Sequence, residues 1–550
     1  MKLKELAPAN LIAAARLART FGTLYGFYDS KERRQRLITL DQLRRQVPKP
    51  GNSKRVLFFS FRGWHTHVAW ESLLAHALRL RGTTVHVFSC GGYLPICEVN
   101  FRHASPILSC TECAAYPRQL LSALNLPHSW LCEYLTAAEQ SEIEGLVNEL
   151  EPDEFEGWVF HGQPIGKLVR DSVLWFLRKS KPDLRGPDAK VYRDFLISGG
   201  HIAVLAPRLL AATRPDVVVE LNGQFFAERI LNRFAGNSTA VVAYEAGWRS
   251  NTLGFDAVSD AGPIDLDSVW ASYAHSLLTQ RENDELDNWI KGRSAGDMER
   301  DFYIRFNKQD RQHPLRRLNL SPDLPTAVLF TNLVWDTAVL NRDLAFPSTH
   351  DWLSATVRLF GHWRDRQLII RIHPAEDLRP SVESREKMAD VIESLGPLPE
   401  NVRVVPAKQQ LSSYRLMDSC QLGLVYTSTT GLEMALHGKP VVVAARVYYR
   451  GRGFTCDVSR ASDYAGIISE AFKATTLSTE QMTLARRFAY LLLFRYLYKI
   501  PVVNQRPRQL PLLDPSETEL LLPGALPELD QLLDAIEKGR DFVPLPCSVV

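Results

Sequence analysis

The sequence predicts an α/β protein built from two Rossmann-like domains, and three observations lead to this prediction. Short apolar runs bounded by turn residues alternate with segments of helical periodicity, which is the pattern of a doubly wound sheet. The pattern occurs twice, and 550 residues are too many for one hydrophobic core. We expect two domains facing a cleft, over residues 51–315 and 316–485, with a helical N-terminal arm over 1–50 and a cross-over helix and helical tail over 486–550.

Composition restricts the class of protein. A hydrophobic content of 45% and a charged content of 23% are those of an ordinary soluble globular protein. The formal net charge of +3 gives no argument for binding nucleic acid, which needs a concentrated basic face. We find no run of the roughly 18 apolar residues that span a bilayer. The first residues resemble a signal peptide, but Lys4, Glu5 and Arg16 interrupt the apolar stretch, so we expect a cytoplasmic protein.

The first domain begins with a strand, a polar loop and a helix. The apolar run at 54–61 predicts a buried strand, the periodicity of 68–81 predicts a helix, and 84–90 predicts the next strand. A mainly helical insert follows over about 115–210, whereas the polar residues 250–315 predict the approach to a linker. Two more strands are expected at 215–223 and 238–248, with a helix between them at 224–234.

The second domain repeats the alternation of strands and helices. Strands are expected at 326–336, 368–372, 402–406, 423–426 and 441–445, with helices at 352–363 and 412–420. A long helix is predicted over 478–498 and a short one over 526–538.

Two strands of the second domain end in residues suited to binding phosphate. LIIRIHPAED ends in Arg371, His373 and Glu376, and GLVYTSTTGLE places a run of hydroxyl residues before a helix. Helix N-termini offer unpaired N–H groups, and ligands of open α/β sheets lie at the carboxyl ends of the strands. Ser and Thr also favour the N-cap of any helix, so a plain cap is the alternative. The donor-binding candidates are Arg371, His373, Glu376, Thr427, Ser428, Thr429, Thr430, Gly431, Glu433, Lys439, Arg446 and Arg450.

These residues carry a family resemblance. RIHPAE, VYTSTTGLEMALHGKPVVVA, YYRGRGF, FTNLVWDTAV, AFPSTHDWL and AYEAGWRSNTL are similar to segments of the bacterial capsule polysaccharide biosynthesis glycosyltransferases, which include capsule Kdo transferases. The resemblance covers about 54–500 and implies a GT-B fold. It also implies sugar transfer from a nucleotide-activated donor to a growing capsular or other surface polysaccharide or a lipid-linked glycan. The likeness favours Glu433 as a contact of the donor ribose.

Related families catalyse other reactions with the same motifs, so three alternative functions stay open. A sugar-nucleotide epimerase binds the same donor but needs no acceptor. A glycerophosphotransferase-like enzyme takes a CDP-linked donor. A non-catalytic subunit retains only the nucleotide pocket.

A base for the acceptor hydroxyl is expected from the first domain. His65 and His67 follow the first strand, and histidine holds a proton near neutral pH. Glu71 lies one helical turn beyond His67, in position to orient it. Glu220 and Glu245 end other strands of this domain and compete for the role. The cleft rim is predicted to include Arg62, Arg249 and Asp336.

Two further patterns bear on metal binding. The spacing of Cys110 and Cys113 is used by zinc and redox sites, but Cys90 and Cys97 are six residues apart, so reduced structural thiols are favoured. A DxD motif occurs only within 265–267, in a polar loop and not at a strand end. We expect a metal-independent transferase without a cofactor.

The segment ARRFAYLLLFRYLYKIP, residues 485–501, mixes aromatic, leucine and basic residues. As a helix it would suit the surface of a membrane, which would place the protein at the inner face of that membrane. The alternative is a buried helix, and it is favoured because the apolar residues surround the helix.

Overall fold

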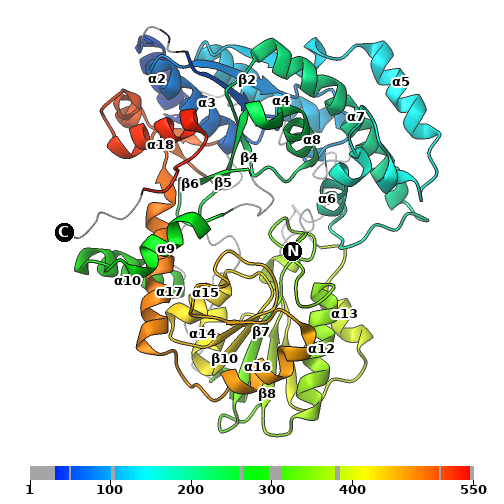
Figure 1. The fold of residues 1–550 in the computed structure, drawn as a ribbon, viewed down its shortest axis with the longest axis vertical. Coiled ribbons are helices and arrows are strands. Elements are labelled where there is room, and N and C mark those ends of the chain that lie inside the picture. The colour runs from blue at the N-terminus through cyan, green and yellow to red at the C-terminus, as the bar shows by residue number, and fades with distance from the viewer. Residues whose placement is uncertain are drawn as a thin grey trace. The chain divides into compact units, whose positions relative to one another are not determined.

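The computed structural model describes residues 31–48, 51, 53–100, 106–258, 264–295, 313–377, 384–506 and 510–544. The chain forms two compact units (Figure 1). Unit 1 comprises Met1–Leu177, Lys181–Asp265 and Tyr496–Pro544, and unit 2 comprises Arg178–Ser180, Leu266–Arg495 and Leu545–Val550. The units therefore divide near residue 265 and not near 315, and Tyr496–Pro544 of the C-terminal tail belongs to unit 1. Most of the predicted N-terminal arm, residues 1–30, lies outside the described residues.

Unit 1 contains a seven-stranded sheet in the order β13-β6-β5-β4-β1-β2-β3. The five strands from β5 to β3 are parallel, whereas β6 and β13 are antiparallel to their neighbours. All residues of β4, VVVEL, are buried, as expected of a parallel strand covered on both faces. The strands are β1 Arg55–Phe59, β2 Thr84–Ser89, β3 His128–Trp130, β4 Val217–Leu221, β5 Ala240–Ala246, β6 Thr252–Ala257 and β13 Leu497–Lys499.

Helices cover both faces of this sheet. Val56 and Phe58 of β1 belong to one hydrophobic cluster, and Leu57 and Phe59 belong to the other, because side chains alternate along a strand. The first cluster includes α2 Lys31–Arg45, α3 His65–Leu80, α4 Pro106–Ala123 and α18 Pro527–Lys538, and the second includes α5 Ala137–Asn148, α6 Ile165–Leu177, α7 Asp188–Thr213 and α8 Phe226–Ala235. In Figure 1, α18 at the red end of the chain lies against α3 at the blue end.

One helix among the described residues, α7, is long and apolar enough to cross a membrane by length and composition alone. However, 72% of its most apolar stretch is buried inside the protein, where it contributes to the second hydrophobic cluster. Burial of this kind is typical of a core helix.

Unit 2 contains a six-stranded parallel sheet in the order β12-β11-β10-β7-β8-β9. The strands are β7 Thr326–Phe330, β8 Gln367–Arg371, β9 Val402–Val405, β10 Leu422–Val425, β11 Val441–Val443 and β12 Cys456–Asp457. The helices are α9 Asp267–His275, α10 Gln280–Ala295, α11 Pro314–Arg317, α12 Thr349–His362, α13 Met388–Ser394, α14 Ser413–Ser419, α15 Thr430–Leu436, α16 Tyr464–Ala471 and α17 Thr479–Tyr490. The prediction of two α/β, Rossmann-like domains is confirmed.

The predicted helix over 478–498 is wrong in its last part. Helix α17 ends at Tyr490, a π-helical turn continues it over Leu491–Arg495, and β13 follows. β13 pairs with β6, which lies in the segment predicted as a polar linker approach. Aromatic residues favour strands, and the Tyr496 hydroxyl donates to Asp256 at 2.5 Å, which joins the two strands.

The segment over 485–501 is largely buried. Phe488, Leu491, Leu492 and Leu493 are each at most 2% exposed. This supports the interpretation as buried structure over that of a helix lying on a membrane. The short strand β3, in the region predicted to be mainly helical, was not predicted from the sequence.

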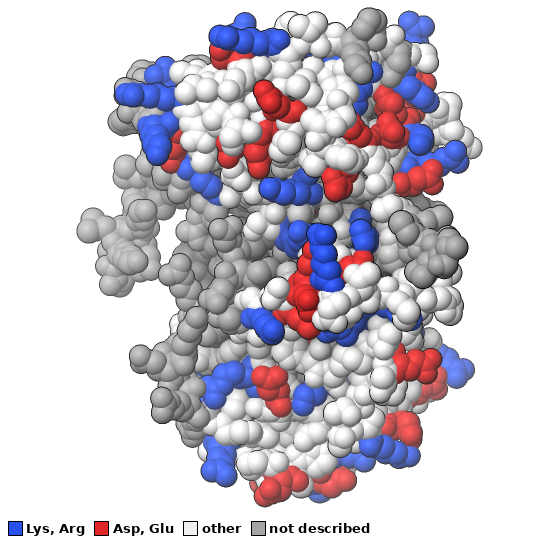
Figure 2. All heavy atoms as spheres, turned by 90° about the vertical axis from the view of Figure 1, so that its left-hand side faces the viewer, with Lys and Arg blue, Asp and Glu red and all other residues white. Residues whose placement is uncertain are grey.

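Charges of both signs are interspersed over the described part of the face shown in Figure 2. This distribution agrees with the nearly balanced net charge of +3.

We predict that His201→Leu reduces the acid sensitivity of unit 1. His201 on α7 is 3% exposed, and burial lowers its pKa to about 4. The unfolded state binds the proton more tightly, so stability present above about pH 6.5 is lost as the pH falls toward 4, by about 3 kcal/mol for this residue. Urea unfolding at pH 7.5 and 4.5 measures this loss.

The exposed His275 provides the control. His275→Leu should keep the wild-type difference between the two pH values. If His201→Leu also keeps that difference, the assignment of acid sensitivity to His201 is wrong.

Candidate functional site

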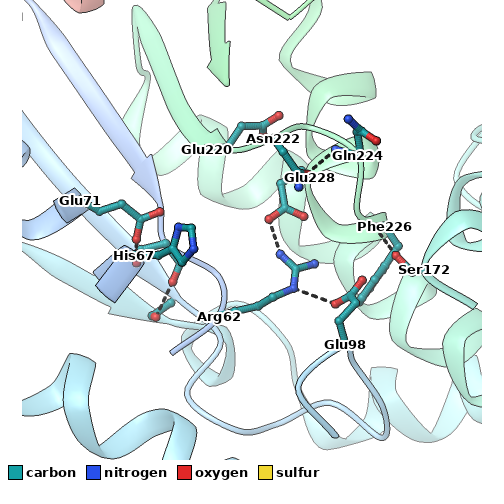
Figure 3. A network of polar contacts seen from close by, with 12 residues as sticks. Arg62, His67, Glu71, Glu98, Ser172, Glu220, Asn222, Gln224, Phe226 and Glu228 are labelled. Carbon is teal, nitrogen blue, oxygen red and sulfur yellow. Dashed lines mark hydrogen bonds and ion pairs between the residues drawn. The ribbon is translucent and has the colours of Figure 1, made fainter. Parts of the chain in front are cut away.

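A buried ion cluster organises the carboxyl edge of the unit 1 sheet (Figure 3). The Arg62 Nε atom, in the loop after β1, donates to Glu98 at 2.7 Å, and its Nη1 atom donates to Glu228. All three side chains are at most 2% exposed. The cluster joins the end of β1, the segment after β2 and the first turn of α8. Arg62 therefore does not lie at a solvent-exposed rim as predicted, because burial and two carboxylates hold it inside.

His67 and Glu71 meet through a residue that was not predicted as a site residue, Tyr244 on β5. The Tyr244 hydroxyl donates to Glu71 Oε1 at 2.8 Å and lies 3.2 Å from His67 Nδ1. The Ser60 hydroxyl donates to the other carboxylate oxygen of Glu71. The predicted role of Glu71 in orienting His67 is therefore indirect. Tyr244 lies near the carboxyl end of the apolar strand β5, and this was the signal available in the sequence.

Burial raises the pKa of Glu71 to about 7, although the hydrogen bonds from Ser60 and Tyr244 oppose the change. Burial and the neighbouring Glu71 raise the pKa of Tyr244 well above its usual value, so its hydroxyl stays protonated. A carboxyl group with a pKa of about 7 is populated in both its ionised and its protonated form near neutral pH.

The other base candidates of unit 1 contact different residues. The His65 ring packs on Tyr116 with ring centroids 5.0 Å apart, because residues two apart on a helix face different directions. Glu220 is fully buried and accepts a hydrogen bond from Asn232 of α8 at 2.7 Å, so the prediction that it faces an acceptor is wrong. Glu245 is half-buried and accepts from the Asn222 side chain at 3.2 Å.

In unit 2, His373 caps the short helical turn Pro374–Glu376 after β8. Its Nδ1 atom accepts the Ala375 N–H at 3.1 Å, so the proton of the neutral ring lies on Nε2. Burial, and then the charge of Arg371, lower the pKa of His373 to about 4. His373 is therefore a neutral N–H donor at pH 7.

Arg371 ends β8 and is 1% exposed. Its Nη1 atom donates to the Pro406 carbonyl at 2.7 Å, whereas Nε and Nη2 have no partner among the described residues. Burial lowers the pKa of Arg371 to about 10. Pro406 follows β9, so this hydrogen bond ties the end of β8 to the end of β9.

We call residues 427–430, which follow β10, the hydroxyl loop. Ser428 Oγ lies 2.6 Å from Thr430 Oγ1, and the Tyr449 hydroxyl donates to the Ser428 carbonyl at 2.5 Å. A Cβ on Gly431 would lie 2.2 Å from that tyrosine hydroxyl, so only glycine fits there. Thr429, the N-cap residue of α15, makes no side-chain cap bond, so the plain N-cap alternative does not describe it. The buried hydroxyl of Thr427 has no partner among the described residues.

Two residues after β7 connect these loops, and they were not predicted as site residues. Thr331 Oγ1 accepts the His373 N–H at 2.9 Å, and Asn332 Oδ1 accepts the Thr427 N–H at 3.4 Å. β7 lies between β8 and β10 in the sheet, so its carboxyl end touches both loops. The polar residues at the end of this strand were the available signal.

The remaining donor-binding candidates do not all lie at this edge. Glu376 is 2% exposed and accepts the Met388 N–H at 3.1 Å, so it shapes the loop after β8 from inside. Lys439 lies two residues before β11, which runs parallel to β10, so it lies at the amino edge of the sheet and its prediction is wrong. It donates to the Asp418 carbonyl at 3.4 Å.

Glu433 on α15 is 7% exposed and holds two partners. Arg293 Nη2 donates to it at 2.8 Å and the Tyr414 hydroxyl donates at 2.8 Å. Arg446 and Arg450 follow β11, at the same edge as the hydroxyl loop. Arg446 is exposed and donates to the Asp343 carbonyl at 2.8 Å, whereas Arg450 donates to Ser459 at 2.9 Å.

The four clustered cysteines of unit 1 line one cavity beside Arg62, and burial raises the pKa of each thiol. All are free thiols: Cys90, Cys97, Cys110 and Cys113. Among the described residues, no group of three or more His, Cys, Asp or Glu side chains is arranged to hold a metal ion. The thiols are protonated at neutral pH, as expected of structural cysteines.

Two Rossmann-like units in one chain, with the C-terminal segment returning to the first, are the composition of a GT-B protein. Residues 300–483 match the family model described as capsule polysaccharide biosynthesis protein. The match covers the loops after β7, β8 and β10, and it confirms the predicted resemblance for this part of the chain. Comparison with curated proteins gives no match.

Solved structures give only distant similarities. The beta Kdo 2,7 transferase KpsC of Thermosulfurimonas dismutans is 15% identical, with 58% of this chain and 88% of that chain covered and a TM-score of 0.34. UDP-GlcNAc 2-epimerase of Neisseria meningitidis is 11% identical, with 79% and 98% covered and a TM-score of 0.22. Sucrose-phosphate synthase of Thermosynechococcus elongatus is 12% identical, with 80% and 95% covered and a TM-score of 0.28. At TM-scores this low, the similarities carry no argument about this chain.

We predict that Arg62→Ala destabilises unit 1 by about 3–5 kcal/mol, because it leaves two carboxylates buried without their counter-ion. Arg55→Ala is the control, since its Nε atom lies 3.9 Å from Asp216 and both side chains are more than a third exposed. That change should cost less than about 1 kcal/mol. Urea unfolding gives both values, and equal losses would contradict the structural importance of the cluster.

A pair of substitutions separates the two nitrogens of His373. His373→Asn keeps an acceptor for the Ala375 N–H but removes the Nε2 donor, whereas His373→Ala removes both. We expect the alanine variant to lose about 1 kcal/mol of stability from the lost cap and the asparagine variant to lose less. Both should bind nucleotide more weakly, as titration calorimetry would measure. Wild-type affinity in both variants would remove His373 from the donor site.

Proposed function

We propose that this chain transfers a sugar from a nucleotide-activated donor to a growing capsular or other cell-surface polysaccharide. The observation that carries the proposal is the family match over 300–483, because it spans the loops at the carboxyl edge of the unit 2 sheet. The acceptor is a polysaccharide or a lipid-linked glycan, and the reaction takes place in the cytoplasm, at the inner face of the membrane when the glycan is lipid-linked.

The chemistry of this edge suits the phosphates of the donor. As the bond to the sugar breaks, the nucleotide gains negative charge, and preorganised donors stabilise that charge. Arg371 has two N–H-bearing nitrogens without a hydrogen-bond partner among the described residues. The buried hydroxyl of Thr427 also has no partner among them. A bound anion would satisfy these groups, which are otherwise costly to bury. The loops after β8 and β10 lie on either side of β7, whose end holds both.

Helix α15 has only seven residues, so its dipole contributes less than the sequence alone suggested. We therefore assign most of the phosphate binding to Arg371, the His373 Nε2–H group and the hydroxyl loop. Glu433 stays the proposed ribose contact, fixed in place by Arg293 and Tyr414.

The proposed transfer uses no divalent cation. The aspartates within 265–267 form the DxD motif of the sequence, and Asp267 forms an ion pair with Arg452. A cationic guanidinium and neutral N–H donors take the place that a metal ion has in other transferases. In unit 1, we assign the role of base to His67, because Tyr244 and Glu71 orient its ring.

A nucleotide screen followed by product analysis tests the proposal. We expect one of UDP, GDP, CMP, CDP or dTDP to raise the stability of the chain, by about 2.7 kcal/mol at a hundred times its dissociation constant. EDTA should not change this shift, and Arg371→Gln should reduce it. The sugar nucleotide of the same base should then be consumed only when a capsular glycan is added, as mass spectrometry detects.

Three other outcomes of this experiment would each support one of the alternative functions. Conversion of the free sugar nucleotide without an acceptor would mean an epimerase, and consumption of CDP-glycerol would mean a glycerophosphotransferase. Binding without any turnover would favour a non-catalytic subunit. Absence of any nucleotide shift would overturn the phosphate site.

A further inference from the structure

The contact between His67 and Glu71 is a continuous chain of hydrogen bonds across three elements of unit 1. It runs from Ser60, after β1, through Glu71 on α3 to Tyr244 on β5, and ends at Nδ1 of His67 on α3. The His67 ring is held by Trp64 and Trp70, with centroids 5.9 and 5.4 Å away. A chain of this length fixes more than the orientation of the ring, because each hydroxyl donates only one proton.

The direction of these hydrogen bonds depends on the charge of Glu71. When Glu71 is ionised, it accepts the Tyr244 proton, so the tyrosine oxygen accepts a proton from His67 Nδ1. The neutral ring then carries its lone pair on Nε2. When Glu71 is protonated, it donates to the tyrosine oxygen, Tyr244 donates to Nδ1, and the ring proton lies on Nε2.

We propose that Tyr244 and Glu71 form a proton relay that sets the tautomer of His67, making Nε2 a base when Glu71 is ionised and an acid when it is protonated. Tyr244 and Glu71 are positioning residues in this scheme, since neither needs to touch substrate. The catalytic consequence rests on the proposed function, whereas the tautomer switch itself does not.

The relay balances protons and charge in the proposed transfer. His67 Nε2 takes the proton of the acceptor hydroxyl as the new bond from that oxygen to the sugar forms and the bond from the sugar to the nucleotide phosphate breaks. At the same time the Nδ1 proton moves to the Tyr244 oxygen, and the Tyr244 proton moves to Glu71 Oε1. The imidazole stays neutral, Glu71 becomes neutral, and the nucleotide leaves with the negative charge.

The charged groups around the relay suit this role. Arg62 acts on Glu71 from the loop after β1 and favours its ionised form, whereas Glu228 acts from α8 and favours its protonated form. Glu245 is a further neighbour of Tyr244 on β5. Burial dominates these influences and places the pKa of Glu71 at about 7, so both states are accessible near neutral pH. An ordinary exposed glutamate would stay ionised and would leave the tautomer unchanged.

Nitrogen NMR of the full chain with labelled histidine tests the switch, because the two ring nitrogens have different shifts in each tautomer and equal shifts in the cation. His67→Gln identifies the signals. We expect the neutral ring to change from the Nε2–H to the Nδ1–H tautomer between about pH 6 and pH 8.5. The same neutral tautomer at both pH values would overturn the proposal.

Three variants separate the relay from a merely structural role. Glu71→Gln should hold the Nε2–H tautomer at every pH, because Ser60 draws the amide oxygen and leaves the NH₂ group facing Tyr244. Tyr244→Phe should abolish the switch. Ser60→Ala is the matched control, since it removes a hydrogen bond of Glu71 that does not lead to His67. It should keep the switch but move it to a higher pH, because that bond lowers the pKa of Glu71. A switch that survives in Glu71→Gln, or is lost in Ser60→Ala with the fold intact by circular dichroism, contradicts the relay.

The catalytic use of the relay is tested by measuring kcat against pH, with the donor and acceptor found for the wild type. Wild-type kcat should rise with pH across about pH 7, and Glu71→Gln should lower kcat by at least about a hundred-fold and flatten this profile. A switch seen by NMR without any transfer activity would refute the proposed function and leave the relay standing. Transfer activity with an unchanged profile in Glu71→Gln would refute the catalytic use of the relay.

Discussion

The buried pairing of Arg62 with Glu98 and Glu228 is the interaction on which the carboxyl edge of the unit 1 sheet depends. Charges removed from water are tolerated only where each has a partner, so these three side chains must come together whenever the unit folds. Their meeting fixes the exit of β1 against the segment after β2 and the first turn of α8. The next residue, Gly63, approaches α4 so closely that a Cβ would lie 1.7 Å from the Cys113 carbonyl oxygen. The start of α3, and with it His67, is thereby held in place.

Unit 2 organises the same edge of its sheet by different means. Its loops are joined by Thr331 and Asn332, which accept backbone N–H groups from the loops on either side. Its buried cation, Arg371, has only a carbonyl as its partner among the described residues. The buried Arg62 of unit 1 therefore has two carboxylate partners, whereas the buried Arg371 of unit 2 has no carboxylate partner among the described residues.

Most of the fold was predictable from the sequence because strands such as β4 and β8 are continuous apolar runs of the expected length. The short strands β3 and β13 were not predictable, because their formation depends on partner strands that are distant in the sequence. Three residues are also too few to show a strand pattern. The site was less predictable for the same reason. Glu71 and Tyr244 are 173 residues apart, and Arg62 and Glu228 are 166 apart. Lys439 was misplaced because it is near the hydroxyl loop in sequence, although a helix carries it to the other edge of the sheet.

The return of the C-terminal segment to unit 1 has a consequence for how the protein is made. The Tyr496 hydroxyl bonds to Asp256, a partner 240 residues earlier, and β13 completes the edge of the sheet beside β6. The ribosome finishes Leu266–Arg495 of unit 2 before it reaches these residues, and domains fold as they emerge. The first part of unit 1 therefore remains incomplete while a later part of the chain folds. During this time β6 is the edge strand of the sheet, with one side unpaired. Open edges pair readily with other chains, so β6 is a segment through which this protein would aggregate during synthesis.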